Sequence, residues 1–134
     1  MGMEKTLMIV KPDAVAAGHI GEIISRAEKE GFQITGLKYL QLTREQAQAF
    51  YAVHKERAFF PALIEYITSG PVVAGRLERD YAVEHWRKVI GATDPSKAAP
   101  GTVRQMFGTS IERNAVHGSD SPQNGEIETV FFFK

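Results

Sequence analysis

The 134-residue sequence predicts an α/β sandwich in which helices pack on a sheet. Three observations support this fold class. Short apolar runs that suit buried strands alternate with longer segments in which apolar residues recur every three or four positions, as on one face of a helix. A third segment, at about 91–113, shows neither pattern and predicts an unusually long loop. Since the chain has no internal repeat or linker, we expect a single domain over residues 1–134.

Composition and charge narrow the class of protein. Apolar residues make up 43% of the chain and charged residues 24%, an ordinary balance for a globular protein. Lys plus Arg and Asp plus Glu both total 16, so no net charge favours nucleic acid or an anionic membrane. Cysteine is absent, which excludes disulfides and thiolate metal sites. With no secretory signal and no apolar stretch near the roughly 20 residues of a membrane span, we expect a soluble, cytoplasmic protein.

The first half of the chain predicts two strands and three helices. The run at 6–10 suits a buried strand, and residues 32–42 suit a longer strand with a bulge near Gly36. Apolar residues spaced i, i+3, i+4 and i+7 indicate a helix over 20–27, ended by Gly31. A capping box at Thr43 opens a second helix, which carries Ala47, Phe50 and Tyr51. A third helix carries Phe59, Leu63, Ile64 and Ile67.

The second half predicts a third strand over 71–78 and a helix capped by Asp80. The apolar face of that helix carries Val83, Trp86 and Ile90, and Gly91 ends it.

Within the long loop, a capping box at 102–105 predicts a turn or two of helix. Residues 115–117 suit a short buried strand, and Ser121-Pro122 suits a helix start. Residues 130–133 suit a last strand.

Several polar residues suit either solvent or a ligand. Lys11 follows the first strand at an edge where α/β folds commonly bind ligands, but it also suits a solvated charge. Arg87 lies off the apolar face of its helix, which by itself favours a solvated helix face over a ligand contact. In the segment Asn114–Pro122, His117 would reach a cavity from the short strand, and Gly118 would let a bulky ligand approach the backbone. From these residues alone, His117 also suits a packed or surface position.

The stretch Asn114 to Ser121 resembles the nucleoside diphosphate kinases, because its pattern Asn-x-x-His-Gly-Ser-Asp is long and unusual. The resemblance runs from about residue 4 to 133 and includes Lys11-Pro12-Asp13, Gly21-Glu22-Ile23-Ile24, Ser69-Gly70-Pro71-Val72-Val73, Gly91-Ala92-Thr93 and Pro100-Gly101-Thr102-Val103-Arg104. It implies a ferredoxin-like βαββαβ fold, with a four-stranded antiparallel sheet covered by helices.

The resemblance also implies a reaction, the transfer of the γ-phosphate of a nucleoside triphosphate, typically ATP, to a nucleoside diphosphate. The transfer is a ping-pong reaction through a phosphohistidine. His117 matches the nucleophile, phosphorylated on the pros nitrogen Nδ1, and a neutral imidazole is nucleophilic near pH 7. Glu128 matches the carboxylate that orients the ring, with Ser119 linked to it, although Glu128 alone would also suit a surface charge.

Further residues match the contacts to a nucleotide. Lys11, Arg87 and Arg104 match phosphate contacts, and Thr93 would supply a hydroxyl. Asn114, together with Lys11, matches contacts to the sugar hydroxyls.

Three more residues match the surroundings of the histidine and the base. Tyr51 matches a residue beside the catalytic histidine. Phe59 matches the ring that stacks on the base, and Ile111 an apolar contact on the base's other face, which would tolerate many bases. The helical spacing of Tyr51 and Phe59 also suits a place in the core.

The expected cofactor is Mg²⁺, held mainly by nucleotide phosphates and water, with no direct protein ligand and Asp120 as a possible outer-shell contact. The expected partners are nucleoside di- and triphosphates, without membrane or nucleic acid. The family implies a homo-oligomer, with a hexamer as first expectation and a tetramer as second.

The sequence departs from the family pattern at Ala58, at Met106, at Gly75-Arg76 and in its short C-terminus at Lys134. None of these is a catalytic match. Two other functions stay open: a catalytically silent nucleotide-binding module on the same fold, and a sheet that binds nucleic acid, which the neutral charge disfavours.

Overall fold

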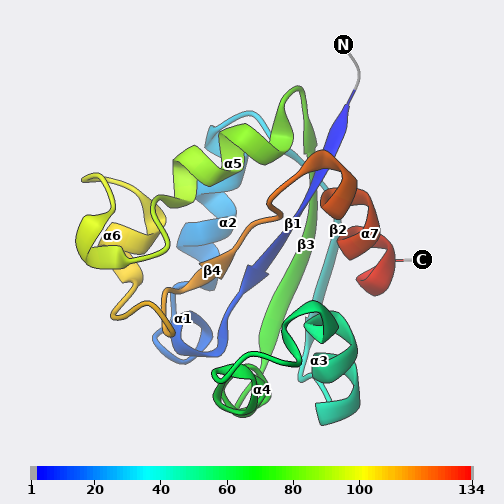
Figure 1. The fold of residues 1–134 in the computed structure, drawn as a ribbon. Helices are drawn as coiled ribbons and strands as arrows, with labels where there is room; N and C mark the ends of the chain where they lie inside the picture. The colour runs from blue at the N-terminus through cyan, green and yellow to red at the C-terminus, as the bar shows by residue number, and fades with distance from the viewer. Residues whose placement is uncertain (1–2, 134) are drawn as a thin grey trace.

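A computed structural model describes residues 3–133 of the chain (Figure 1). Strands and helices follow one another in the order β1 (Glu4–Val10), α1 (Pro12–Ala16), α2 (Ile20–Lys29), β2 (Gln33–Leu40), α3 (Arg44–Phe50), a 3-10 turn (Ala52–His54), α4 (Phe60–Ile67), β3 (Val72–Arg79), α5 (Ala82–Ile90), a second 3-10 turn (Pro95–Lys97), α6 (Val103–Phe107), β4 (Val116–His117) and α7 (Pro122–Phe132).

The four strands form one sheet in the order β2-β3-β1-β4, and all three neighbouring pairs are antiparallel. With α2 between β1 and β2 and α5 between β3 and β4, the chain has the βαββαβ arrangement of a ferredoxin-like fold. Helices α3 and α4 are inserted between β2 and β3. The predicted fold class is therefore confirmed.

Helices cover both faces of the sheet, with α2 and α5 on one face and α3, α4 and α7 on the other (Figure 1). Strand β1 therefore contributes to two cores, because alternate side chains of a strand point to opposite faces. Met8 and Val10 pack with α2 and α5, whereas Leu7 and Ile9 pack on the other side. This double covering explains why the whole run at 6–10 is buried.

The turn and capping residues are largely as the sequence predicts. The register of β2 shifts between Ile34 and Gly36, where the bulge was expected. Gly31 has a φ of +87°, and backbone bonds from Gly31 to Glu28 and from Phe32 to Ala27 close α2. The capping box at Thr43 is complete, but the one predicted at 102–105 is not. The Gln105 side chain, in contrast, accepts from Gly101 instead of Thr102, so that box is half formed.

The prediction of a last strand at 130–133 is wrong. Residues up to Phe132 continue α7, and the Phe133 amide still donates to the Thr129 carbonyl at 2.8 Å. The helical turn buries Phe132 and leaves Val130 on the outside, 54% exposed. A run of four apolar residues does not distinguish a buried strand from the end of a helix.

Two other local predictions also need correction. Asp80 does not cap α5, because Tyr81 precedes the helix with a φ of +53°, and the Val83 amide donates instead to Glu4 Oε1 at 2.9 Å. Phe59 does not lie within α4 but directly before its first residue.

Candidate functional site

The short strand β4 fixes the position of the histidine. It pairs with the end of β1, with Ile9 opposite His117 and Val10 opposite Val116. The imidazole Nε2 of His117 lies 2.9 Å from Glu128 Oε1 on α7. Within residues 3–133, Nδ1 makes no hydrogen bond, so the ring has one held nitrogen and one available nitrogen.

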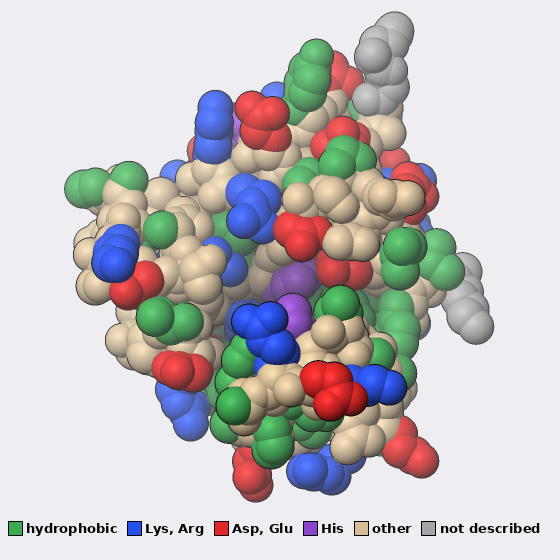
Figure 2. Space-filling model, viewed as in Figure 1, with side chains coloured by type: hydrophobic (Ala, Val, Ile, Leu, Met, Phe, Trp, Pro, Cys, Tyr) green, Lys and Arg blue, Asp and Glu red, His purple; other side chains and the backbone are tan. Residues whose placement is uncertain are grey.

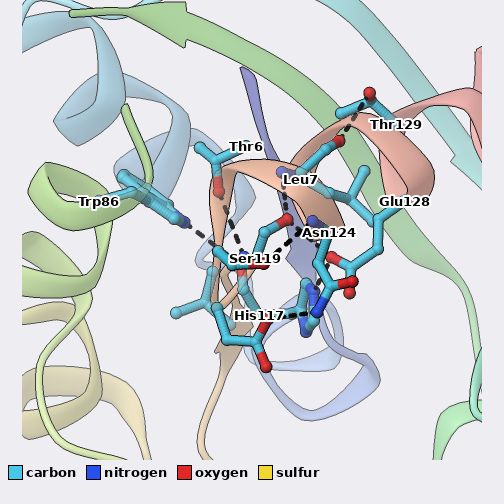
Figure 3. A network of polar contacts seen from close by, with 12 residues as sticks. Thr6, Leu7, Trp86, His117, Ser119, Asn124, Glu128 and Thr129 are labelled. Atoms are coloured by element: carbon cyan, nitrogen blue, oxygen red, sulfur yellow. Dashed lines mark hydrogen bonds and ion pairs between the residues drawn. The ribbon is translucent and has the colours of Figure 1, made fainter. Parts of the chain in front are cut away.

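Glu128 is itself held by Ser119 (Figure 3). The Ser119 hydroxyl donates to Glu128 Oε1 at 2.7 Å and accepts from the backbone amide of Leu7 at 3.0 Å. The Ser119 amide in turn donates to Thr6 Oγ1 at 3.2 Å. Since Thr6 and Leu7 lie in β1 and all three residues are fully buried, this chain of bonds ties the carboxylate to the buried strand.

Gly118 has a different role from the one its sequence position predicts. A Cβ at this position would lie 2.7 Å from Cδ1 of Trp86, so the space beside Gly118 is filled by the indole and not by a ligand. Trp86 is fully buried on α5, and its Nε1 donates to the carbonyl of His117 at 3.2 Å (Figure 3). The indole thus holds the backbone of His117, whereas Glu128 holds its ring.

The surroundings of His117 favour the neutral form of its imidazole. Burial lowers the pKa of His117 below its ordinary value, and Lys11 and Arg104 lower it further, while Glu128 opposes the shift. Next to this pair, Tyr51 is 9% exposed, and burial and the nearby Glu128 raise the pKa of its phenol. The Tyr51 hydroxyl is buried without a hydrogen-bond partner in the part of the chain described.

Lys11 directly follows β1, and its side chain bonds to the loop that precedes the histidine. Its Nζ donates to Asn114 Oδ1 at 2.9 Å, and Asn114 Nδ2 donates to the backbone carbonyl of Thr93 at 3.1 Å. Burial, together with the nearby Arg104, lowers the pKa of Lys11 to about 8. The alternative of a freely solvated lysine is therefore wrong.

Arg104 is 9% exposed and connects the end of α5 with β4. It donates to the carbonyls of Gly91 at 3.0 Å and of Val116 at 2.9 Å. Its Nε has no partner among residues 3–133, so the guanidinium retains unused donors. Burial, followed by repulsion from Arg87, lowers the pKa of Arg104 to about 10.

Arg87 and Thr93 are both exposed. Arg87 is close enough to repel Arg104, but its side chain forms no hydrogen bond or ion pair with another residue in the 3–133 range. The backbone carbonyl of Thr93 accepts from Asn114, and within the described residues its hydroxyl forms no hydrogen bond. Figure 2 shows basic, acidic and histidine side chains gathered around a hollow in the middle of this face, between the α6 region and α3.

An apolar cleft of about 570 Å³ opens beside Lys11. Phe59 and Ile111 line it and are 45% and 55% exposed, so Phe59 is not a core residue. The Arg57 guanidinium lies 5.5 Å from the centre of the Phe59 ring, and the His54 ring lies 5.6 Å from it. The two residues predicted to stack on the base, Phe59 and Ile111, thus line the same cleft as Lys11.

Sequence reasoning missed Trp86, Thr6 and Leu7 as supports of the site, and Phe50, whose ring lies 5.8 Å from that of His117. Their apolar spacing indicated only core packing. The bonds of Trp86, Thr6 and Leu7 depend on which strands are neighbours, which no local pattern in the sequence specifies.

The departures from the family pattern lie outside this network. Met106 is 48% exposed, and Arg104 finds backbone carbonyls in place of an acidic partner. Arg76 pairs with Glu78 at 3.7 Å and covers the Phe133 ring. Ala58 is exposed, and Lys134 lies outside the described residues.

Within residues 3–133, no group of three or more His, Asp or Glu side chains is placed to hold a metal ion. None of the helices in this range is long and apolar enough to cross a membrane.

Comparison with known proteins identifies the class. A family model described as nucleoside diphosphate kinase matches residues 4–134. The chain is 56% identical over 131 residues to a nucleoside diphosphate kinase of Wolinella succinogenes, covering 98% of this chain and 96% of that protein.

Solved structures agree. A nucleoside diphosphate kinase of Aquifex aeolicus superposes with a TM-score of 0.96 at 47% identity, covering 99% of this chain and 96% of that one. A halophilic nucleoside diphosphate kinase of Halobacterium salinarum, in complex with CDP, gives a TM-score of 0.95 at 40% identity, over 99% and 89% of the two chains. Fold and matches together define a phosphotransferase. The chain belongs to the nucleoside diphosphate kinase family.

Proposed function

We propose that this protein transfers the γ-phosphate of a nucleoside triphosphate, typically ATP, to a nucleoside diphosphate through a phosphohistidine on His117. The observation that carries the proposal is the ring geometry, with Nε2 bonded to Glu128 and Nδ1 available. Glu128 favours the tautomer with a proton on Nε2, which leaves the lone pair on Nδ1. A half-buried imidazole oriented in this way, whose lowered pKa favours the neutral form, is a competent nucleophile.

In the first half-reaction, Nδ1 of His117 attacks the γ-phosphorus. The bond from phosphorus to the bridging oxygen breaks, and the nucleoside diphosphate leaves with that electron pair. In the second, a terminal oxygen of another diphosphate attacks the phosphohistidine, and the N–P bond breaks. Glu128 would stabilise the positive charge that the ring gains on phosphorylation, with Ser119 holding the carboxylate in place.

Phosphoryl transfer needs positioning and charge compensation more than further covalent chemistry. Lys11, Arg87 and Arg104 would supply the positive charge, since Arg104 lies close enough to both Lys11 and Arg87 to interact with their charges. The Thr93 hydroxyl would add a donor, and Asn114 with Lys11 would contact the sugar hydroxyls. Tyr51 would contribute its unpaired hydroxyl beside His117.

Mg²⁺ fits this donor set as an ion carried by the nucleotide. Glu128 is occupied by His117 and Ser119, and the proposed phosphate contacts are three cations and the Thr93 hydroxyl, so phosphate oxygens and water would be the main ligands of Mg²⁺. We propose no direct protein ligand, and Asp120 is the candidate for an outer-shell contact. Bound with the phosphates, Mg²⁺ would neutralise part of their charge.

Initial rates with ATP and GDP test the proposal. A double-displacement reaction gives parallel lines in double-reciprocal plots when both substrates are varied. Intersecting lines would contradict a phosphoenzyme intermediate. Nucleotide binding without any transfer would identify the silent module, and binding of nucleic acid alone would identify the third possibility.

Replacing Glu128 with glutamine is expected to lower kcat about 10- to 100-fold, because the ring loses its charged orienting partner. Since Glu128 raises the pKa of His117, the acid-side decline of kcat/KM should also move to lower pH. A pH–rate profile measures both effects. Glu126→Gln on the same helix is the control that should leave the profile unchanged, because the Glu126 side chain is 60% exposed and pairs with Lys5.

Replacing Phe59 with alanine is expected to raise KM for all nucleotides by about 5- to 100-fold, because stacking on an aromatic ring contributes roughly 1–3 kcal/mol per base. Phe59→Trp keeps a stacking surface and should retain a KM near the original. An unchanged KM in Phe59→Ala would contradict the base slot between Phe59 and Ile111.

We also propose a single domain over residues 1–134, a cytoplasmic location, and assembly into a homo-oligomer, with a hexamer as first expectation and a tetramer as second. The edge strand β2 supports assembly, because Leu37 and Tyr39 expose 50% and 66% of their surface beside an unpaired strand edge. Light scattering of the purified protein gives the number of subunits.

A further inference from the structure

A strained turn lies two residues before the histidine. Ala115 has a φ of +79°, and the Val116 amide donates to the Asn114 carbonyl at 3.0 Å. This bond between residues i and i+2 around a positive φ defines a γ-turn of the rare, strained form. A residue other than glycine adopts it only when its surroundings hold it there.

The turn separates two functional side chains. Asn114, before it, bonds to Lys11, whereas His117, after it, pairs with Glu128. The direction in which the chain leaves Ala115 therefore sets how the imidazole lies relative to Lys11 and Asn114.

Asp13 holds this turn. Its Oδ2 accepts from the Ala115 amide at 3.1 Å, and its Oδ1 accepts from the hydroxyl of Tyr66 on α4. The Ala115 carbonyl accepts from the Lys11 amide at 2.8 Å, so both polar groups of the turn residue are paired. Because Ala115 is fully buried, its amide would have no water to replace Asp13.

We propose that Asp13 is a positioning residue of this site, whose carboxylate keeps Ala115 in the γ-turn and thereby aligns His117 with Lys11 and Asn114. Its effect on rate rests on the proposed phosphoryl transfer, but its effect on the imidazole does not. Asp13 does not touch the proposed reacting atoms. Tyr66 supports it by fixing the second carboxylate oxygen.

Asp13 also carries a charge, which raises the pKa of Lys11. Asparagine separates the two roles. In Asp13→Asn, the amide oxygen can accept from Ala115 while the NH₂ group donates to the Tyr66 oxygen, so the hydrogen bonds remain and the charge is lost. A positioning role predicts that Asp13→Asn keeps kcat within about 3-fold of the original, whereas Asp13→Ala loses about 10- to 100-fold, as a small misplacement does.

Glycine at position 115 provides a sharper test. Because glycine adopts positive φ without steric cost, Ala115→Gly should restore much of the lost rate in the Asp13→Ala background. In the otherwise unchanged protein it should have little effect. A carboxylate that acted only through its charge would give no such rescue.

The decisive experiment measures kcat and the ¹⁵N chemical shifts of the His117 ring in the original protein, Asp13→Ala, Asp13→Asn and Asp13→Ala/Ala115→Gly, with circular dichroism to verify folding. We expect the shifts to move in Asp13→Ala and to return in the other two variants. Tyr66→Phe, which removes only the hydroxyl, replaces Asp13→Ala if that variant does not fold, and should move the shifts less.

The outcomes separate the two claims. An original protein that transfers no phosphate contradicts the proposed function, and the ring shifts still decide the role of Asp13. The role of Asp13 is overturned if the original protein is active and its Asp13→Ala and Tyr66→Phe variants keep the same kcat and ring shifts. It is also overturned if Asp13→Ala and Asp13→Asn lose kcat equally and Ala115→Gly does not restore it.

Discussion

Replacing His117 with alanine is expected to reduce kcat by at least about 10⁴-fold, because the variant has no group that can receive the phosphate. Binding of nucleotide should persist, since Lys11, Arg104 and the cleft beside Phe59 stay intact. Steady-state assays with ATP and GDP, together with calorimetric titration of ADP, measure the two properties separately.

His85→Ala is the matched control. His85 forms another His–Glu pair, with Nε2 2.8 Å from Oε1 of Glu30, the residue directly after α2. Its loss should leave kcat nearly unchanged. An equal loss in both variants would mean that such pairs act through stability and not through chemistry.

Replacing Lys11 with methionine is expected to lower kcat/KM about 10²- to 10³-fold, because a positioned cation that compensates phosphate charge is lost. The pH dependence gives a second readout. With a pKa of about 8, Lys11 is charged below that pH and loses its charge above it, so kcat/KM of the original protein should fall as pH rises past about 8. Lys11→Met should lack this alkaline decline.

A lysine outside the site provides the control for Lys11. Lys29→Met, in the exposed last turn of α2, should change neither kcat/KM nor its pH dependence. If the alkaline decline persisted in Lys11→Met, another group would be responsible for it.

Much of the fold follows from local patterns. The short strand-like runs identified β1 and β3, and Gly31, Gly36 and Thr43 each marked a turn, bulge or cap that the structure contains. The end of α7 could not be predicted in this way, because the apolar run at 130–133 contains no signal that separates helix from strand. The prediction of the α5 cap failed for a different reason: the carboxylate that accepts from the Val83 amide belongs to Glu4, which lies 79 residues away in the sequence.

The site shows the same division. The motif around His117, and the resemblance it carries, named the histidine, Glu128 and the cations by residue. It did not show that Ser119 is held by Thr6 and Leu7, because that contact spans more than 110 residues and arises from the pairing of β4 with β1. Gly118 illustrates the limit most clearly: its lack of a side chain was visible, but the indole of Trp86 that requires it was not.

Phosphoryl transfer through His117 is tested most directly by isolating the phosphorylated protein. Incubation with Mg²⁺ and γ-labelled ATP should give an acid-labile label on Nδ1 of His117, and addition of GDP should move that label to GTP within one turnover. Absence of the label, its survival in His117→Ala, or its failure to leave on addition of GDP would contradict the mechanism.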